Sequence, residues 1–357
     1  MARIIYGVHG TGHGHAIRAL AVARMFPEHE FLFVSHGDGL ALLSREHRVF
    51  ECPNPETIVA AHRVAATATL LRLLRFLGKR GPLRKSLRAA FDRFQPDAAI
   101  TDYEHFVPIV AREAGIRCLS LDHQHVIPLC AAQVPWFRYP DYLATVWSLR
   151  RLFSAAEAHL VTSFFRPPRT GKTNVLPPLL RPSVLRRAPR TGEHVLAYQG
   201  YSTFPRFLPF LKQIPGPVVV YGLDRTGRDG NMTFKSADEE EFLDDLASCR
   251  YVVCGGGHSL ISEALYYGKP VLSVPIRHAI EQYLNAWNVQ HLGYGRLLQD
   301  ENPSAARLAE FEAGLDAFRN RIRSAAFCGN DAIAAAIRHF IAGGAQRPAP
   351  ANESASP

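Results

Sequence analysis

Residues 252–286 read VVCGGGHSLISEALYYGKPVLSVPIRHAIEQYLNA, and this stretch decides the expected fold. A short apolar run ends at Cys254, three glycines follow, and a helical pattern begins near Ser259. Glycine lets a backbone approach a ligand closely, and the free N–H groups at a helix start favour phosphate. In open parallel sheets, ligands bind outside the carboxyl ends of the strands. The stretch therefore predicts a phosphate-binding strand–turn–helix unit in a parallel sheet.

The same alternation of strands and helices extends over most of the chain. Strand patterns occur near residues 3–8, 30–37, 97–103, 116–124 and 158–165, and the series restarts at residue 193. Helical patterns separate them, which is typical of βαβ units with parallel sheets. The proline-rich segment 166–192 opposes both helix and central strand.

We therefore predict an α/β protein of two Rossmann-like domains. The first domain is expected at 1–165 and the second at 193–330, with residues 166–192 as the linker between them. A helix at 331–343 and a disordered, low-complexity tail at 344–357 are expected to follow.

Composition limits the class of protein. The 357 residues suit two domains, and no apolar stretch reaches the roughly 18 residues that a membrane-spanning helix needs. The six cysteines form no Cys-x-x-Cys pair and are expected to be free thiols in a reducing compartment. A net charge of +9 favours anionic partners such as nucleotides, and the aromatic–basic pattern of RNA-binding sheets is absent. We expect a cytoplasmic protein that does not bind nucleic acid.

Residues 57–94 predict a basic, leucine-rich helix. Its seven cations between residues 70 and 88 are Arg72, Arg75, Lys79, Arg80, Arg84, Lys85 and Arg88. The favoured interpretation is a helix packed on the sheet with a solvated basic face. The alternative, peripheral binding of segment 70–88 to an anionic membrane surface, stays open. The aromatic segment 135–142 is expected to pack in the core or a loop, with stacking on a flat acceptor as its alternative.

Polar residues around the glycine turn predict a nucleotide-sugar site. Ser259 can cap the helix or bond to a phosphate. Glu263, one turn later, can accept hydrogen bonds from ribose hydroxyls. Glu281 and Gln282 follow a strand end and can bond to sugar hydroxyls. Phe234 is expected to lie near the nucleobase.

This segment resembles the donor site of the GT-B glycosyltransferases. It is most similar to the branch that contains the peptidoglycan N-acetylglucosaminyltransferase, and to the related UDP-glycosyltransferases. The resemblance implies that the turn binds the diphosphate, a helix glutamate binds ribose, and an acidic residue with glutamine binds the sugar. The matching positions are Gly255, Gly256, Gly257, His258 and Ser259 for the turn, Glu263 for ribose, and Glu281 with Gln282 for the sugar. It also implies two Rossmann-like domains that face each other across a cleft.

The segment GTGHGHAIRALAVA, residues 10–23, resembles the loop after the first strand in the same family. His15 takes the place of the family's loop histidine, and His13 is an extra residue. A histidine titrates near neutral pH and can accept the proton of an acceptor hydroxyl. Asp102 is the predicted partner that orients the ring, with Glu104 as second choice. The alternatives are a helix cap for Asp102 and a purely phosphate-binding role for the loop.

Histidines gather at strand ends of the first domain. The spacing of His9, His13, His15, Asp122, His123 and His125 matches no common zinc motif, so a metal site is disfavoured. The predicted acceptor-binding residues are Gly12, His13, Gly14, Glu104, His123 and His125, whereas His9 is expected to be structural. The resemblance implies a metal-independent enzyme without a cofactor, which uses the nucleotide-sugar as a co-substrate.

These residues predict an inverting glycosyltransferase, a hexosyltransferase with His15 as general base. A UDP-sugar is favoured over a dTDP-sugar as donor, and the acceptor hydroxyl is expected on a small molecule or a lipid. Two alternatives stay open. One is a nucleotide-sugar epimerase or hydrolase on the same fold, and the other is a nucleotide-sugar-binding protein without catalysis.

Overall fold

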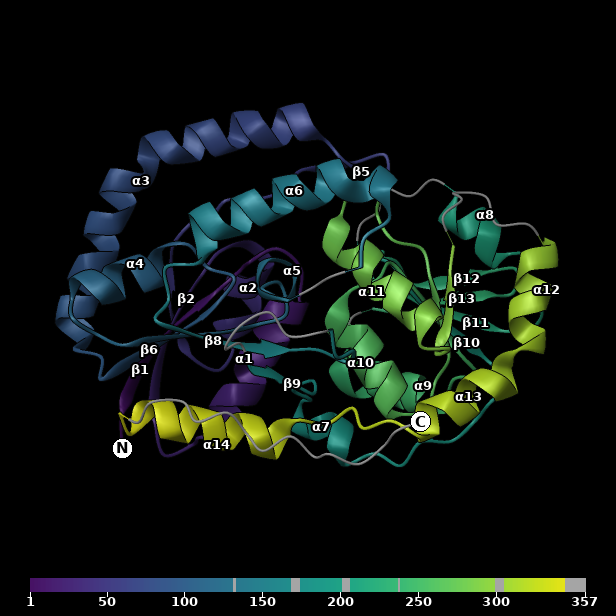
Figure 1. The fold of residues 1–357 in the computed structure, drawn as a ribbon. Helices are drawn as coiled ribbons and strands as arrows, with labels where there is room; N and C mark the ends of the chain where they lie inside the picture. Colours follow the sequence, from purple (N-terminus) through teal and green to yellow (C-terminus); the bar gives the residue numbers. More distant parts are fainter. Residues whose placement is uncertain (131–132, 168–173, 201–205, 237, 299–304, 344–357) are drawn as a thin grey trace.

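The computed structural model has two α/β domains, each built on a seven-stranded sheet (Figure 1). It describes residues 1–130, 133–167, 174–200, 206–236, 238–298 and 305–343. The expectation of two Rossmann-like domains is confirmed. The tail predicted at 344–357 lies outside the described residues.

The first sheet is parallel throughout, in the order β3-β2-β1-β6-β7-β8-β9. Its strands are β1 (Arg3–Val8), β2 (Glu30–Ser35), β3 (Arg48–Glu51), β6 (Ala98–Asp102), β7 (Cys118–Asp122), β8 (Ala158–Thr162) and β9 (Asn174–Leu176). The helices between them are α1 (Gly14–Met25), α2 (Gly37–Leu43), α3 (Ala66–Phe94), α4 (Phe106–Glu113), α5 (Val126–Leu129) and α6 (Tyr139–Ser148). Apolar side chains of α1 pack on one face of the sheet, and those of α3 and α4 pack on the other. Helices on both faces explain why β1 and β6 are almost continuously apolar.

The second sheet has the order β12-β13-β11-β10-β14-β15-β16, and only β12 is antiparallel to its neighbour. Its strands are β10 (Val195–Tyr198), β11 (Val218–Tyr221), β12 (Gly227–Asp229), β13 (Met232–Phe234), β14 (Val252–Cys254), β15 (Val271–Ser273) and β16 (Gly295–Leu297). Its helices are α8 (Phe207–Leu211), α9 (Glu239–Ser248), α10 (His258–Tyr266), α11 (Ile280–His291), α12 (Ala305–Ala313) and α13 (Leu315–Arg323).

The predicted linker at 166–192 needs a correction. β9 lies inside this segment and pairs in parallel with β8, so the first sheet extends beyond residue 165. The short helix α7 (Pro182–Leu185) also lies within it. An edge strand of three residues bonds to one neighbour and leaves no periodic signal in the sequence, and proline is tolerated beside it.

The predicted C-terminal helix is confirmed as α14 (Asn330–Ile341), and it returns to the first domain. Figure 1 shows α14 alongside that domain, close to the N-terminus of the chain. Its residues Ile333, Ile337 and Phe340 are buried in one cluster with Ile4 and Tyr6 of β1. The first domain is therefore completed by the last helix of the chain.

The helix predicted at 57–94 begins later, at Ala66. The preceding residues form a hairpin of β4 (Val59–Ala60) and β5 (Arg63–Val64), which turns at Ala61 and His62 with positive φ. The backbone of this hairpin is held by the second domain, because Val64 N–H donates to Arg277 O at 2.9 Å. This tertiary contact overrides the local helical pattern.

Candidate functional site

The two glycine loops face each other between the domains. The loop after β1 leads into α1 at Gly14, and the turn after β14 leads into α10 at His258. Ser259 Oγ donates to Gly14 O at 3.4 Å, which joins the starts of the two helices. Gly256 has φ +100°, and a Cβ there would lie 2.7 Å from Gln282 O, so only glycine fits without strain. The site thus lies where the carboxyl ends of both sheets meet, as expected for parallel α/β folds.

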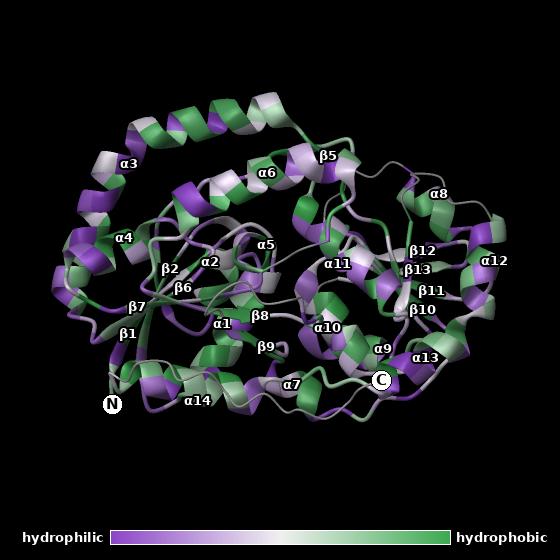
Figure 2. Ribbon diagram, viewed as in Figure 1, coloured by the Kyte–Doolittle hydropathy of each residue, from purple (hydrophilic) through white to green (hydrophobic). Residues whose placement is uncertain are grey.

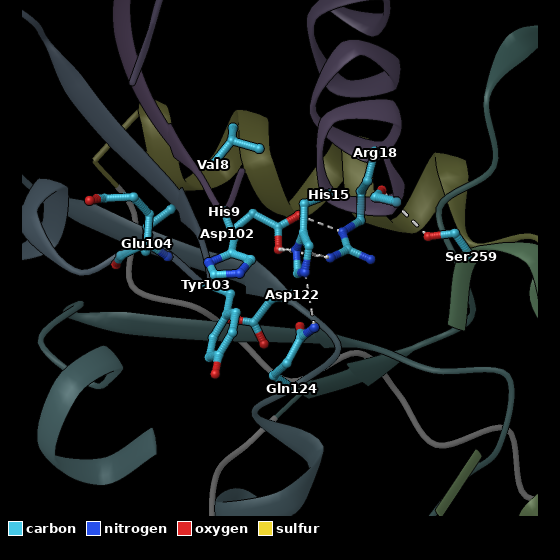
Figure 3. Close-up of polar contacts among 12 residues, drawn as sticks. Val8, His9, His15, Arg18, Asp102, Tyr103, Glu104, Asp122, Gln124 and Ser259 are labelled. Carbon is cyan, nitrogen blue, oxygen red and sulfur yellow. Dashed lines mark hydrogen bonds and ion pairs between the residues drawn. The ribbon is translucent and has the colours of Figure 1, made fainter. Parts of the chain in front are cut away.

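His15 and Asp102 are in direct contact, as Figure 3 shows. His15 Nδ1–H donates to Asp102 Oδ1 at 2.8 Å, and the carboxylate is fully buried at the end of β6. With Nδ1 carrying the proton, Nε2 is the acceptor nitrogen of the neutral ring. This arrangement orients the imidazole and can stabilise its protonated form.

Arg18 is a third member of this cluster that the sequence interpretation missed. Its Nε donates to Asp102 Oδ2 and its Nη2 to Oδ1, both at 2.7 Å, and the side chain is buried. Burial alone would lower the pKa of Arg18, but the charge of Asp102 more than offsets this and holds the pKa above its ordinary value. Its position one turn after His15 on α1 was the available signal, because residues three apart share a helix face.

Gln124 lies between the histidine and the predicted sugar-binding residues. Its Nε2 donates to His15 Nε2 at 3.3 Å and to Glu281 Oε2 at 3.2 Å. Glu281 lies in the first turn of α11 in the second domain, so this one amide links the two domains at the cleft. Gln282 lies beside the glycine turn, where its Oε1 accepts from Ile276 N–H at 3.0 Å.

Tyr103 forms an aromatic wall next to His15. Its ring stacks on Phe153 at 4.1 Å and lies 5.9 Å from the His15 ring. Its φ of +54° is uncommon for a non-glycine residue, and such strain gathers at functional sites. Burial raises the pKa of the Tyr103 hydroxyl above its ordinary value, so the phenol stays neutral at physiological pH.

Glu263 is already paired inside the protein. Arg181 donates through Nε and Nη2 to its two carboxylate oxygens, each at 2.8 Å, and Glu263 is 4% exposed. A bidentate pair of this kind occupies one face of the carboxylate. The ribose-binding role implied by the resemblance stays a prediction, and Arg181 is a nearby charged residue that the sequence interpretation missed.

His258 and His123 pack against each other across the domain interface. Their ring centroids are 3.8 Å apart and nearly parallel, and both side chains are buried. Asn285 ties the pair to the turn, because its Oδ1 lies 2.7 Å from His123 Nε2 and its Nδ2 donates to Gly256 O at 3.0 Å. Burial lowers the pKa of His258 well below its ordinary value. These side chains help to hold the two domains together, and the predicted roles of His123 in acceptor binding and of His258 in the phosphate-binding turn stay predictions.

Three further predicted residues are occupied elsewhere. Glu104 accepts from Phe106 N–H and Val107 N–H at 2.8 and 2.6 Å, so it caps α4, and its acceptor-binding role stays a prediction. His125 Nδ1 donates to the buried Asp122 at 2.7 Å. Phe234 is buried in the core of the second domain, with the Arg225 guanidinium 3.9 Å from its ring centre. A strand end predicts the neighbourhood of a side chain, but packing decides its direction.

The other residues of the loop after β1 differ in exposure. His13 is exposed at the start of α1, and Gly12 N–H donates to Asp38 Oδ2 at 2.9 Å. His9 is buried, with its Nδ1 2.7 Å from Asn54 Nδ2.

Within the described ranges, no group of three or more His, Cys, Asp or Glu side chains could hold a metal ion.

Comparison with known proteins gives the family. Residues 2–315 match the family model described as glycosyl transferase family 1. The chain belongs to this glycosyltransferase family. The glycosyltransferase is 24% identical over 339 residues to an uncharacterized glycosyltransferase of Methanosarcina mazei, covering 84% of this chain and 86% of the relative. A shorter match, 40% identical over 79 residues, covers 22% of this chain and 21% of an uncharacterized glycosyltransferase of Methanosarcina acetivorans.

Solved structures agree on the GT-B arrangement of this glycosyltransferase. The kitacinnamycin glycotransferase has a TM-score of 0.67 at 16% identity, covering 95% of this chain and 99% of that one. MurG of Acinetobacter baumannii has a TM-score of 0.58, with the same identity and the same coverage. A UDP-glucosyltransferase of Polygonum tinctorium has a TM-score of 0.66 at 16% identity and covers 96% and 99% of the two chains. The expected GT-B fold is confirmed.

Proposed function

We propose that this glycosyltransferase moves a sugar from a UDP-sugar to an acceptor hydroxyl with inversion of configuration. His15 Nε2 removes the hydroxyl proton as the acceptor oxygen attacks the anomeric carbon. The bond from that carbon to the diphosphate breaks, the nucleoside diphosphate leaves from the opposite face, and the proton remains on the imidazolium beside Asp102. No covalent enzyme intermediate and no metal are required.

The contact between His15 and Asp102 is the observation that carries this proposal. It leaves Nε2 as the basic nitrogen, and that nitrogen points to Gln124 and through it to Glu281. An acceptor hydroxyl that takes the place of the Gln124 amide would lie between the base and a sugar bound by Glu281. General-base catalysis needs this reach of a hydrogen bond.

The donor test uses the intact chain in a calorimeter, with UDP-, dTDP- and GDP-sugars and without added metal. Tight binding of the UDP-sugars alone is expected, and Glu281→Gln is expected to weaken it at least about tenfold through the lost charged hydrogen bond. The exposed Glu193→Gln is the matched control. Binding of dTDP-sugars alone would overturn the choice of nucleotide, and binding of none would overturn the donor site. Glu263→Ala is avoided because it would leave Arg181 buried without its partner.

The catalytic test uses His15→Gln and His15→Ala with the donor that binds, because Asp102→Asn would leave the buried Arg18 without its charged partner. We expect kcat to fall about 10²–10⁴-fold in each variant while donor affinity is kept. Nuclear magnetic resonance of the first product tests inversion, and activity in a chelator tests metal independence. Full activity of His15→Gln would rule out the proposed base, and release of free sugar without any acceptor would favour a hydrolase.

A further inference from the structure

Large apolar side chains reach solvent mainly on two neighbouring segments of the first domain. They are Leu70, Leu71 and Leu74 on α3, and Trp136, Phe137, Tyr139, Leu143 and Trp147 on η1 (Trp136–Arg138) and α6. Each is at least 48% exposed, and Trp136 is 83% exposed. We name these eight residues the apolar rim. Contiguous exposed apolar surface on a soluble protein marks an interaction site.

The aromatic part of the rim follows one helix face. Tyr139, Leu143 and Trp147 are spaced four residues apart, and Trp136 precedes them by three, so they line up along α6. The adjoining face of α6 packs on the core through Tyr142 and Val146. Both faces are thus apolar, and only one of them is covered by the protein. The expectation that segment 135–142 packs in a core or loop is corrected for Trp136, Phe137 and Tyr139.

Contacts at both ends bring the two segments together. The hairpin just before α3 bonds to Arg277, and Asp141 at the start of α6 lies 3.1 Å from His278 Nδ1, so both helices start at one loop. Further along, the His105 ring meets Phe76 of α3 at 5.4 Å and Phe153, which follows α6, at 6.3 Å. Figure 1 shows α3 and α6 running along the same edge of the molecule.

The start of α3 is less buried than its end. Pro82 lies inside the helix, and Figure 1 shows α3 changing direction along its length. After Pro82, Leu87, Phe91 and Phe94 pack into the core, whereas before it only Phe76 is buried. Figure 2 shows hydrophobic and hydrophilic residues interleaved along this helix.

The positive charges on α3 indicate which kind of partner the apolar rim binds. Arg72, Arg84 and Arg88 pair with Glu56, Glu113 and Asp92. Arg75, Lys79, Arg80 and Lys85 are exposed and make no ion pair with any part of the chain that the structure describes. Tryptophan and tyrosine favour the boundary between lipid and water, and each nearby Lys or Arg adds attraction to anionic lipid.

We propose that the apolar rim, with Arg75, Lys79, Arg80 and Lys85, docks on the surface of an anionic lipid bilayer. Leucine and aromatic side chains enter the interface while the four cations contact lipid phosphates. No helix in the described ranges is long and apolar enough to cross a membrane, so the docking is peripheral. The inference concerns this surface alone and does not depend on the proposed reaction.

The test is flotation of the full chain with vesicles of phosphatidylcholine, with or without a third of phosphatidylglycerol. We expect binding to the anionic vesicles alone, weakened at least about tenfold by Arg75→Gln, Lys79→Gln, Arg80→Gln and Lys85→Gln together. The matched control makes the same charge change at four exposed arginines elsewhere, Arg45, Arg228, Arg321 and Arg323. Equal weakening in both sets would mean unspecific charge attraction and would overturn the proposal.

Tryptophan fluorescence tests the apolar part. The chain has three tryptophans, and Trp287 packs on the core of the second domain. Brominated lipids are expected to quench wild-type emission, and Trp136→Phe with Trp147→Phe is expected to abolish this quenching while Trp287 still emits. No flotation, or quenching that survives in the double variant, would overturn the proposal.

Light scattering tests whether a second copy of the chain covers the rim instead. A dimer that dissociates on Leu70→Ser, Leu71→Ser and Leu74→Ser would assign the rim to that second copy and overturn the proposal. Donor calorimetry on the same samples separates these outcomes from failure of the proposed function.

Discussion

At the scale of single residues, Asp102 serves two partners at once. One of its oxygens accepts from both His15 and Arg18, and the other accepts from Arg18. The guanidinium fixes the carboxylate and places a positive charge beside the imidazole, with its Nη2 3.2 Å from His15 Nδ1. Arg18 is therefore a positioning residue that acts through Asp102.

Replacing Arg18 is expected to lower kcat through the position of His15. Without the guanidinium, the Asp102 carboxylate loses the two hydrogen bonds that fix it, so Arg18→Met should lower kcat while the KM for the donor is kept. The buried Asp102 also loses its main partner, which costs about 3–5 kcal/mol of unfolding free energy. Arg18→Lys should restore much of kcat, whereas Arg24→Met at the exposed end of α1 serves as control. An unchanged kcat would mean that Arg18 has only a structural role.

Glu104 should make the free energy of unfolding depend on pH. Burial raises the pKa of this carboxyl to about 7 from 4.5, so the folded state holds a proton that the unfolded state releases. Glu104 therefore stabilises the folded state fully below pH 4.5. This stabilisation is at most about 3 kcal/mol and is lost as the pH rises through about 7. Urea unfolding from pH 4.5 to 8 should show a flatter profile for Glu104→Gln than for wild type. Parallel profiles would show that the carboxyl does not titrate in this range.

At the scale of elements, the turn between β14 and α10 was predictable, and its strain was not. The sequence shows three glycines, but only the structure shows that Gly256 has φ +100° while Gly257 has φ −65°. The three positions therefore differ in what they tolerate.

Gly256→Ala is expected to lose about 1–3 kcal/mol of unfolding free energy and to weaken donor binding. Its Cβ would meet Gln282 O at 2.7 Å, which forces the turn away from α11. Gly257→Ala meets nothing within 4 Å, so its unfolding free energy should stay near the wild-type value. Urea unfolding of the two variants checks this order, and equal losses would contradict the strain argument.

At the scale of the whole molecule, the last helix of the chain packs on the first domain. α14 fills the core of the first domain after the second domain is complete, and Asn330 bonds to both backbone groups of Leu180. The bounds predicted for this helix, 331–343, lie within two residues of those of α14, but the sequence does not show which domain the helix completes.

Ile337→Ala on α14 should therefore destabilise the first domain. The side chain is fully buried against β1, so its truncation is expected to cost about 2–5 kcal/mol. Hydrogen exchange should show faster exchange in β1 and β6 than in β14 and β15. The exposed Ala335→Ser is the control. Equal acceleration in both sheets would mean that the two domains unfold as one unit.

The sequence by itself determined the two parallel α/β domains, the glycine turn and the pair of His15 with Asp102. These are set by local periodicity, by glycine conformation and by the rule that parallel strands end at one edge of a sheet. Only the tertiary structure decided which polar side chains are free to act. Glu104 caps a helix, Glu263 pairs with Arg181 and His123 stacks on His258, because buried polar groups must find partners wherever packing places them. Those partners lie up to 135 residues away along the chain for His123, a separation that no local pattern encodes.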